Sequence, residues 1–445
     1  MRVLIVTAGS LGDVAPYTGL GARLRAAGHR VALAAPDPYA DLVTGAGLDF
    51  RPVSGDLSAL RNAAPSRPRR IGVPGAPGLV EFVRLGGRFV GGLGESIATA
   101  AGLGADVLLL SATTAPLGYS VAQYLGVPSI GVFLQPVDPT RAFPPIVLGV
   151  RTLGGWGNRA AGRLGQLLVR RVYADASRGL RSRLGLPPCD LAGLDRHATA
   201  RGWPVSHGFS PTVLPRPPDW RPGLDVVGYW WPATPAGWQP PAALRAFLAA
   251  GDAPVYVGFG SLADNGGRLY TMVRHALRRA GVRAVVQGVG PATASEPGLV
   301  GHDRPAPEVG SGRQGGQDPD GGPDDGDDQV LTIGEVPHEW LFPRMAAVVH
   351  HGGCGTTGAG LRAGVPAVPV PMLADQPFWA ARLARLGVSP DVIPFRRLDE
   401  ARLGDAIRAA VTDPVFGTRA RLIADRMAGE DGAAAMVAAI DRLAR

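Results

Sequence analysis

The sequence predicts an α/β protein with two Rossmann-like domains, whose parallel sheets face an interdomain cleft. Residues 3–7 form an apolar run that leads through a glycine-containing turn into a helical pattern, the start of a βαβ unit. Residues 254–262 repeat this order, and residues 346–380 contain a strand, a glycine-rich turn, a helix and a second strand. At 445 residues the chain is also too long for one ordinary core, so two domains are expected.

The first domain is expected to occupy residues 1–215. Its first helix is predicted from about residue 14 to residue 27, because Gly28 then provides a helix stop. Short apolar runs predict the other buried strands, at residues 31–36, 105–111 and 127–134.

Residues 55–93 interrupt this alternation with many prolines, glycines and arginines. The simplest interpretation is a surface loop followed by a helix. Such a segment could also form a mobile lid or an acceptor-binding loop, and its basic amphipathic end could contact a membrane surface.

Residues 216–241 are rich in proline and tryptophan and are predicted to link the domains. The second domain is expected over residues 242–425, with a C-terminal helix over residues 426–445. A polar, low-complexity insertion at about residues 291–328 is expected to be disordered. Its aspartate clusters resemble a metal-binding DxD, but a solvated acidic loop is the favoured interpretation.

Composition excludes several classes of protein. The formal net charge is +8, yet the chain contains no lysine, so a P-loop NTPase and lysine Schiff-base chemistry are excluded. The arginines are scattered, which argues against a nucleic-acid partner. Cys189 and Cys354 suggest neither a metal framework nor a disulfide, as expected in the cytoplasm. The N-terminus looks like a strand rather than a signal peptide, and no apolar run is long enough for a membrane span.

The stretch HHGGCGTT, residues 350–357, is the strongest candidate for a binding site. Its glycines permit a sharp turn, and its threonines can cap the helix that follows. A helix N-terminus suits a phosphate or pyrophosphate, and His350 and His351 would add hydrogen-bond donors. The alternative is that the glycines only tighten the turn and the histidines are packing residues.

Polar residues at other strand ends extend this candidate site. Asp375 and Gln376 follow the next strand and offer a carboxylate and an amide for sugar hydroxyls. Asp13, near the start of the first helix, is either a helix cap or a general base that faces the cleft. Ser10 and Ser261, each in a glycine turn, are candidates for ligand contacts.

Five motifs distributed over nearly the whole chain resemble the GT-B glycosyltransferases, in the nucleotide-sugar-dependent family that includes sterol glucosyltransferases and actinobacterial antibiotic glycosyltransferases. The motifs are GSLGDVAPYTGLG, DWRPGLDVVGYWW, PVYVGFGSL, EVPHEWLFPRMAAVVHHGGCGTTGAGLRAGVP and ADQPFWA. The chain departs from the family pattern in two ways. Leu11 replaces the arginine of the GSRGD form, and the acidic insertion before Gln329 exceeds the usual length. His338 stands where many relatives have glutamine.

The resemblance implies an acceptor site mainly on the first domain and a nucleotide-sugar site mainly on the second. It makes Asp13 the catalytic base, assigns Asp375 and Gln376 to the sugar hydroxyls, and places the nucleobase against the backbone of Val336. The residues that it assigns to the donor diphosphate are Ser10, Ser261, His351, Gly353, Gly355 and Thr356.

The implied reaction is the inverting transfer of a hexose or deoxyhexose from a UDP- or TDP-sugar to a hydroxyl of a hydrophobic acceptor, with no metal and no other cofactor. The acceptor is expected to be a polyketide, macrolide or peptide natural product; the alternative is a sterol, hopanoid or glycolipid. Neither nucleic acid nor an integral membrane segment is expected, while peripheral membrane contact stays open.

Two other classes of function fit the sequence less well. A dinucleotide oxidoreductase would begin similarly, but the first turn, Gly9 to Gly12, lacks the GxGxxG spacing. A non-catalytic regulator that binds sugar nucleotides is disfavoured by the presence of Asp13, His351, Asp375 and Gln376 together.

Overall fold

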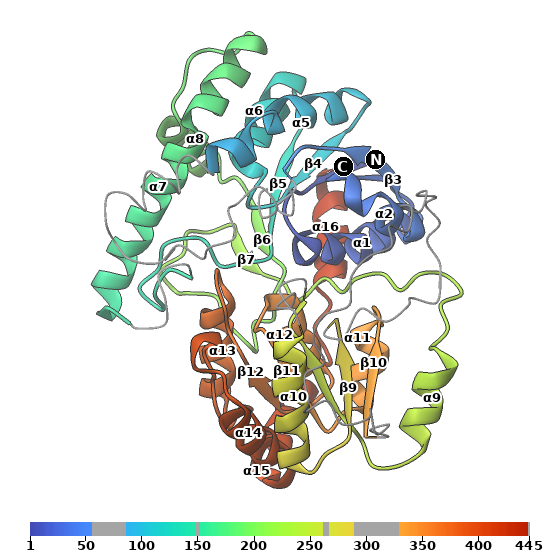
Figure 1. Cartoon of the computed structure of the whole chain (residues 1–445). Coiled ribbons are helices and arrows are strands. Elements are labelled where there is room, and N and C mark those ends of the chain that lie inside the picture. Colours follow the sequence, from blue (N-terminus) through green and yellow to red (C-terminus); the bar gives the residue numbers. More distant parts are fainter. Residues whose placement is uncertain (56–85, 147–151, 261–266, 289–328, 444–445) are drawn as a thin grey trace, which may run out of the picture.

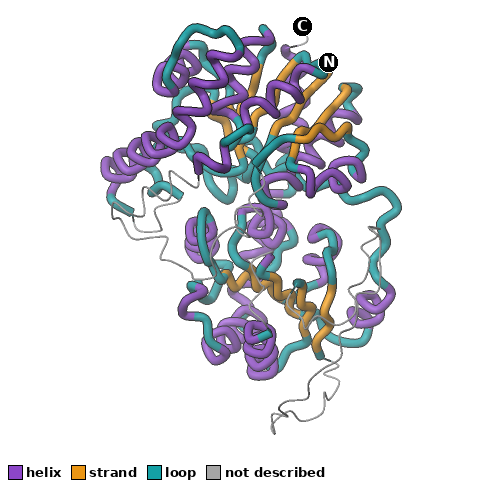
Figure 2. Tube along the Cα trace, turned by 45° about the horizontal axis from the view of Figure 1, so that its top comes forward, coloured by secondary structure: helices purple, strands orange, loops and turns teal. Residues whose placement is uncertain are grey.

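The computed structural model describes residues 1–55, 86–146, 152–260, 267–288 and 329–443. It contains two parallel sheets, one in each half of the molecule, with helices on both faces of each sheet (Figures 1 and 2). The predicted α/β class with two sheets is confirmed. Ser261 and the insertion at residues 291–328 lie outside the described residues, as does most of the segment 55–93.

The N-terminal sheet has seven parallel strands in the order β3-β2-β1-β4-β5-β6-β7. Its central strands are covered on both faces, which explains why they read as continuous apolar runs such as RVLIV and VLLL. The strands are β1 (Arg2–Val6), β2 (Arg30–Ala35), β3 (Asp49–Pro52), β4 (Val107–Leu110), β5 (Ser129–Phe133), β6 (Val205–His207) and β7 (Leu224–Val226).

Helices and short 3-10 turns connect these strands. The first helix begins at Leu11, three residues before the predicted start, because Ser10 is its N-cap. The helical elements of this half are α1 (Leu11–Ala26), η1 (Asp37–Tyr39), α2 (Ala40–Gly45), α5 (Leu93–Gly102), α6 (Ala115–Leu125), α7 (Gly154–Arg183) and α8 (Leu191–Ala200).

The C-terminal sheet has five parallel strands in the order β10-β9-β8-β11-β12. Its strands are β8 (Val255–Gly258), β9 (Ala284–Gln287), β10 (Val330–Ile333), β11 (Ala347–His350) and β12 (Ala367–Pro369). Its helical elements are α9 (Ala242–Ala249), α10 (Arg268–Ala280), α11 (His338–Leu341), η3 (Phe342–Arg344), α12 (Cys354–Arg362), α13 (Gln376–Leu386), η4 (Phe395–Arg397), α14 (Glu400–Thr412) and α15 (Pro414–Met427).

The last helix, α16 (Gly432–Leu443), returns to the N-terminal half and lies beside α1, as Figure 1 shows. Met436 and Ile440 are fully buried there, in the same apolar cluster as Tyr17 of α1. Trp230, from the predicted linker, packs in this cluster and donates from its indole Nε1 to the carbonyl of Gly432 at 3.1 Å. The two segments that pass from one half to the other, near Trp230 and near Gly432, therefore contact each other.

The segment predicted as a linker, residues 216–241, contains the short strand β7, which pairs in parallel with β6 at the edge of the N-terminal sheet. An edge position is compatible with the many prolines nearby, because an edge strand needs ladder hydrogen bonds on one side only.

Candidate active site

The start of α12 contacts the N-terminal half at the carboxyl ends of its strands. The Cys354 thiol, at the first position of α12, donates to the carbonyl of Leu134 at 3.4 Å, directly after β5. Helices α1 and α12 also contact each other. Loops that follow parallel strands in α/β proteins are the usual ligand sites, and here two sets of such loops meet.

Asp13 lies in the first turn of α1, where its side chain is partly exposed and is bound by Ser10. The amide nitrogen and the hydroxyl of Ser10 both donate to Asp13 Oδ2, at 2.9 Å each, in a reciprocal capping arrangement. Burial raises the pKa of the Asp13 carboxyl, while hydrogen bonds from Ser10 and Gln135 partly oppose this shift. The predicted capping role is therefore present, although Ser10 rather than Asp13 is the N-cap. The Ser10 contacts use one carboxylate oxygen only.

Gly9 allows the Asp13 carboxylate to sit against the turn. Its φ angle is 141°, and a Cβ at this position would lie 2.5 Å from Asp13 Oδ2. Ser10 is a predicted diphosphate contact, but its hydroxyl donates a hydrogen bond to Asp13. A phosphate contact by this hydroxyl would require it to leave Asp13, so that role stays a prediction.

The N-terminus of α12 presents a set of free backbone donors. Gly353 is its N-cap, and the first intrahelical bond runs from the amide of Thr357 to the carbonyl of Gly353. The amides of Cys354, Gly355 and Thr356 therefore lack intrahelical partners, and Gly355 is exposed. Three converging amides with the positive end of the helix dipole suit an anion such as a diphosphate.

His351 lies beside this helix start and is partly exposed. A Cβ on Gly353 would be 2.6 Å from His351 Nε2, so the glycine makes room for the imidazole. Burial lowers the pKa of His351, and the Gly258 backbone partly opposes the shift. A neutral imidazole is therefore expected at neutral pH before an anion binds.

His350 does not share this position, although the sequence suggested both histidines as donors. Its side chain is 1% exposed, and its Nδ1 accepts a hydrogen bond from the amide of Gly352 at 3.1 Å. Burial lowers the pKa of His350 to about 3, with a further contribution from His351. Here the packing interpretation is the correct one, since His350 ends the buried strand β11.

The Gly353 contact gives a testable prediction. We expect Gly353→Ala to push the His351 ring out of place and to weaken UDP or TDP binding by about tenfold, the scale of one hydrogen bond to a charged group. Gly360→Ala is the matched control in α12, because no atom lies within 4 Å of its added Cβ. Calorimetric titration of both variants with each nucleotide is the measurement. Equal affinities in the two variants would contradict this role of Gly353.

Asp375 and Gln376 begin α13, after a loop in which Ala374 adopts a left-handed backbone with a φ of 56°. Asp375 Oδ2 accepts a hydrogen bond from the indole Nε1 of Trp379 at 2.9 Å. Gln376 Oε1 accepts from the amides of Met372 and Leu373, at 2.9 and 3.1 Å. The Gln376 amide nitrogen is thus the group still able to donate to a ligand.

The pKa values of Asp375 and Cys354 depend on charges from both halves of the molecule. Burial raises the pKa of Asp375 to about 6, and the negative charge of Asp13 contributes to this rise. The hydrogen bond from Trp379 acts in the opposite direction. Burial also raises the pKa of Cys354, and the charges of both Asp375 and Asp13 contribute. Carboxylates from opposite halves therefore lie close enough to influence each other, with Cys354 near both.

Val336 and His338 form the remaining predicted contact region. Val336 is 6% exposed and packs in a cluster with Tyr256 and Phe342. The His338 ring stacks on Phe342, with 4.2 Å between the ring centroids. Burial lowers the pKa of His338 to about 4, and His351 contributes to the shift. A contact of the Val336 backbone with a nucleobase stays a prediction.

Sequence reasoning missed two supporting residues. Gln135 hydrogen-bonds to Asp13, and Trp379 holds Asp375. Gln135 directly follows a predicted strand, the same signal that identified Asp375. Trp379 lies four residues after Asp375, a spacing at which helix-start side chains meet.

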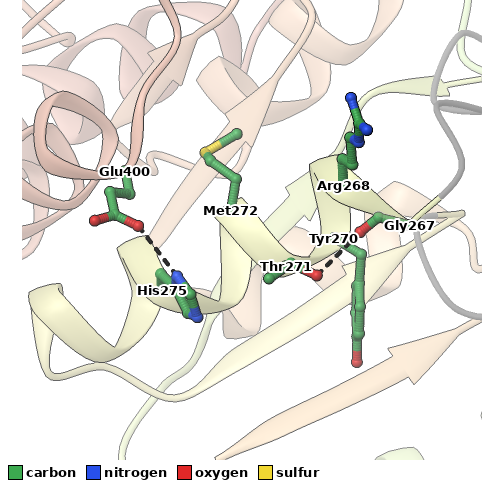
Figure 3. A pocket seen from close by; sticks show the side chains of 7 residues that line it. All are labelled: Gly267, Arg268, Tyr270, Thr271, Met272, His275 and Glu400. Atoms are coloured by element: carbon green, nitrogen blue, oxygen red, sulfur yellow. Dashed lines mark hydrogen bonds and ion pairs between the residues drawn. The ribbon is translucent and has the colours of Figure 1, made fainter. Parts of the chain in front are cut away.

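A separate hollow lies on the C-terminal half, at the start of α10 and beside α14 (Figure 3). Its side chains point in different directions, and its polar pair is His275 with Glu400, 3.1 Å apart. The lining is Gly267, Arg268, Tyr270, Thr271, Met272, His275 and Glu400. These groups do not converge on one point as an active site requires.

Two kinds of feature are absent from the described residues. Among these residues, no group of three or more His, Cys, Asp or Glu side chains is arranged to hold a metal ion. Within the same part of the chain, no helix combines the length and apolar character needed to cross a membrane.

Comparison with known proteins connects this candidate site with sugar transfer. Residues 324–443 match a family model described as erythromycin biosynthesis protein CIII-like, C-terminal domain. The chain is 34% identical over 459 residues to O-mycaminosyltylonolide 6-deoxyallosyltransferase of Streptomyces fradiae, with 97% of this chain and 95% of that protein covered. It is 32% identical over 453 residues to a sterol 3-beta-glucosyltransferase of Arabidopsis thaliana, with 99% of this chain and 65% of that protein covered.

Solved structures share the architecture. The glycotransferase of kitacinnamycin superposes with a TM-score of 0.66 at 20% identity, covering 99% of this chain and 98% of that one. The Streptomyces sp. SF2575 glycosyltransferase SsfS6, complexed with thymidine diphosphate, has a TM-score of 0.61 at 23% identity, with 99% of each chain covered. The fold is therefore that of the GT-B glycosyltransferases.

Within this class, the chain belongs to the nucleotide-sugar-dependent glycosyltransferase family that includes the antibiotic and sterol enzymes named above. It is a glycosyltransferase of the hexosyltransferase type.

Proposed function

We propose that this protein moves a hexose or deoxyhexose from a UDP- or TDP-sugar to a hydroxyl of a hydrophobic natural product, with inversion at the anomeric carbon. The observation that carries the proposal is the contact of α12 with the N-terminal half, at Leu134 and at α1, where the charges of both Asp13 and Asp375 act on Cys354. In this proposal, Asp13 is the base for the acceptor and Asp375 the carboxylate for the donor sugar, and the start of α12 is the anion site.

In the proposed step, Asp13 takes the proton of the acceptor hydroxyl. The acceptor oxygen attacks the anomeric carbon while the bond from this carbon to the diphosphate oxygen breaks, and the nucleotide diphosphate leaves with the bonding electrons. The raised pKa of Asp13 makes it a stronger base than an exposed aspartate. Attack from the face opposite the leaving group inverts the anomeric configuration.

The leaving diphosphate is assigned to the amides at the start of α12 and to His351, with Gly353, Gly355 and Thr356 shaping the turn. Helix-terminus donors and an imidazole stabilise the developing negative charge without a divalent cation, so we propose metal-independent transfer. Ser10 and Ser261 remain proposed diphosphate contacts, Val336 a nucleobase contact, and Asp375 and Gln376 contacts of the sugar hydroxyls.

We propose a first domain over residues 1–215, a connection over residues 216–241 and a second domain over residues 242–425. The helix within residues 426–445 would complete the first domain, since its apolar side packs there. The proposed location is the cytoplasm, where cysteines such as Cys189 and Cys354 stay reduced.

A natural-product acceptor is favoured because the Streptomyces fradiae relative, which matches over 95% of its own length, is named for a tylonolide acceptor. A sterol, hopanoid or glycolipid acceptor is the second candidate, supported by the sterol glucosyltransferase relative. The test is incubation with UDP-glucose and TDP-glucose, using macrolide aglycones in one set of reactions and sterols in another. We expect a β-linked glucoside by NMR. An α-linked product would overturn the inverting mechanism.

His351 should make nucleotide binding depend on pH. Its pKa lies below the ordinary value in the free protein, and a bound diphosphate raises it again by its charge. Nucleotide binding should therefore take up a proton at pH values between the pKa of His351 in the free protein and its pKa in the complex. Over this range the affinity should rise as the pH falls toward the lower of the two values. Calorimetry in buffers of different ionisation enthalpy measures this uptake. We expect it to be larger in the natural protein than in His351→Asn, and equal uptake would contradict the assignment.

A further inference from the structure

Exposed apolar side chains are concentrated on helix α7. Among the described residues, five of the fourteen exposed large hydrophobic side chains lie between residues 153 and 169. Trp156 is 81% exposed, and Leu164 and Leu167 are each 56% exposed. Isolated exposed apolar residues are common, but a concentration of this kind on one helix marks an interaction surface.

Trp156, Leu164 and Leu167, with Leu153 just before the helix, form what we call the α7 stripe. Within α7, Trp156, Leu164 and Leu167 are separated by eight and three residues, so they follow one face of the helix. Val169 is also exposed, at 45%, but two residues after Leu167 it points to another side of the helix. Figure 1 shows α7 at the outer edge of the N-terminal half, with its first turns extending away from the sheet.

The charges around the α7 stripe are basic. Arg163 and Arg171 are exposed beside it, and among the described residues neither has a salt-bridge partner. Other arginines of the helix differ in this respect, because Arg159 pairs with Asp219 and Arg170 with Asp195. A two-fold dimer built on this face would place the unpaired arginines of both copies in one interface. An anionic surface would instead complement them.

The inner side of α7 connects this surface to the cleft. Asn158 Nδ2 donates to the carbonyl of Arg141 at 3.3 Å, and Gly162 packs against Pro139. Arg141 and Pro139 belong to the loop after β5 that begins near Gln135, the partner of Asp13. The same loop carries Phe143, whose ring lies 5.3 Å from that of Phe378 in α13. A surface bound to α7 would therefore lie next to the loop that leads to the cleft.

We propose that α7 docks the protein on an anionic lipid surface, with Trp156, Leu164 and Leu167 inserted among the lipids and Arg163 and Arg171 against the headgroups. A basic helix with an apolar face and a tryptophan is the usual form of an interfacial membrane anchor. Docking goes beyond the proposed reaction and does not rest on it, because vesicle binding needs neither donor nor acceptor. It would place the loop after β5 at a surface where hydrophobic molecules partition.

The experiment is co-sedimentation of the full chain with vesicles of phosphatidylcholine mixed with phosphatidylglycerol, and with vesicles of phosphatidylcholine alone. We expect binding to the anionic vesicles that weakens in high salt. The triple variant W156S/L164S/L167S should bind at least about tenfold more weakly, and R163Q/R171Q about tenfold more weakly. Val169→Ser is the matched control and should bind as the natural protein does.

Three outcomes would overturn the proposal. The first is no binding to anionic vesicles, or equal binding to both kinds of vesicle. The second is an equal loss in the triple variant and in Val169→Ser, since binding would then depend on something other than the α7 stripe. The third comes from two further measurements on the triple variant. A lowered thermal midpoint would mean that the chain covers the stripe itself, and conversion of a dimer to a monomer in sedimentation would identify a second copy as the occupant.

Discussion

Asp13→Asn is expected to lower the turnover of sugar transfer by a hundredfold or more while UDP or TDP still binds. Removal of a general base typically costs about 10²–10⁴ in rate, and an amide cannot accept the acceptor proton. Asparagine can still accept hydrogen bonds from Ser10, so the start of α1 should survive. Steady-state kinetics with a responsive acceptor, and calorimetry with the nucleotide, provide the two readouts.

Ser10→Ala separates the capping role of this region from the proposed chemistry. It removes the hydroxyl that donates to Asp13 Oδ2 but keeps the carboxylate itself. Loss of an N-cap costs about 1 kcal/mol of stability, so the unfolding midpoint should fall moderately. Transfer should fall by about tenfold at most, the scale of the single diphosphate contact proposed for this hydroxyl. If Ser10→Ala abolished transfer as fully as Asp13→Asn, Asp13 would act through the fold of the turn rather than as a base.

Asp375→Asn is the variant with the second-largest expected effect. A carboxylate that accepts bonds from sugar hydroxyls contributes about 1.5–3 kcal/mol for each bond, so kcat/KM for the donor sugar should fall by about a hundredfold. Affinity for UDP or TDP alone should change little, because these nucleotides carry no sugar at that position.

Asp413→Asn is a matched control for Asp375→Asn. Asp413 also stands at the start of a helix, where its side chain accepts from the amide of Val415. In the part of the chain that the structure describes, its hydrogen bonds join it only to nearby residues of α14 and α15. Its loss should leave kcat/KM unchanged. Equal donor kinetics for Asp375→Asn and the natural protein would remove Asp375 from the sugar site.

The sequence supported the fold prediction strongly because strand identity follows from local apolar runs. Buried strands such as residues 3–7 and 254–258 contain almost nothing but apolar residues, and each is followed by a glycine turn. The start of α1 was misplaced by three residues, although Ser10 and Asp13 already had the spacing of a capping box.

The sequence predicted which strand ends carry the candidate site residues, but not the contacts that these residues make. Parallel strands end at one edge of a sheet, so Asp13 and Asp375 could be assigned to such edges from their positions after strands. The hydrogen bond from Gln135 to Asp13, and the return of α16 to the N-terminal half, depend on contacts between distant segments. Local patterns carry no information about such contacts. The opposite environments of His350 and His351 likewise follow from strand register and from the space left by Gly353.

The central claim is that Asp13 and Asp375 approach each other from opposite halves, and the titration of the Asp375 carboxyl tests it most directly. Burial raises the pKa of Asp375 to about 6, and the negative charge of Asp13 contributes to this rise. The titration can be followed by carbon-13 NMR of aspartate-labelled protein, with the Asp375 signal assigned by its loss in Asp375→Asn. We expect a lower pKa of Asp375 in Asp13→Asn than in the natural protein. An equal pKa of Asp375 in both proteins would contradict the proposed arrangement of the two carboxylates.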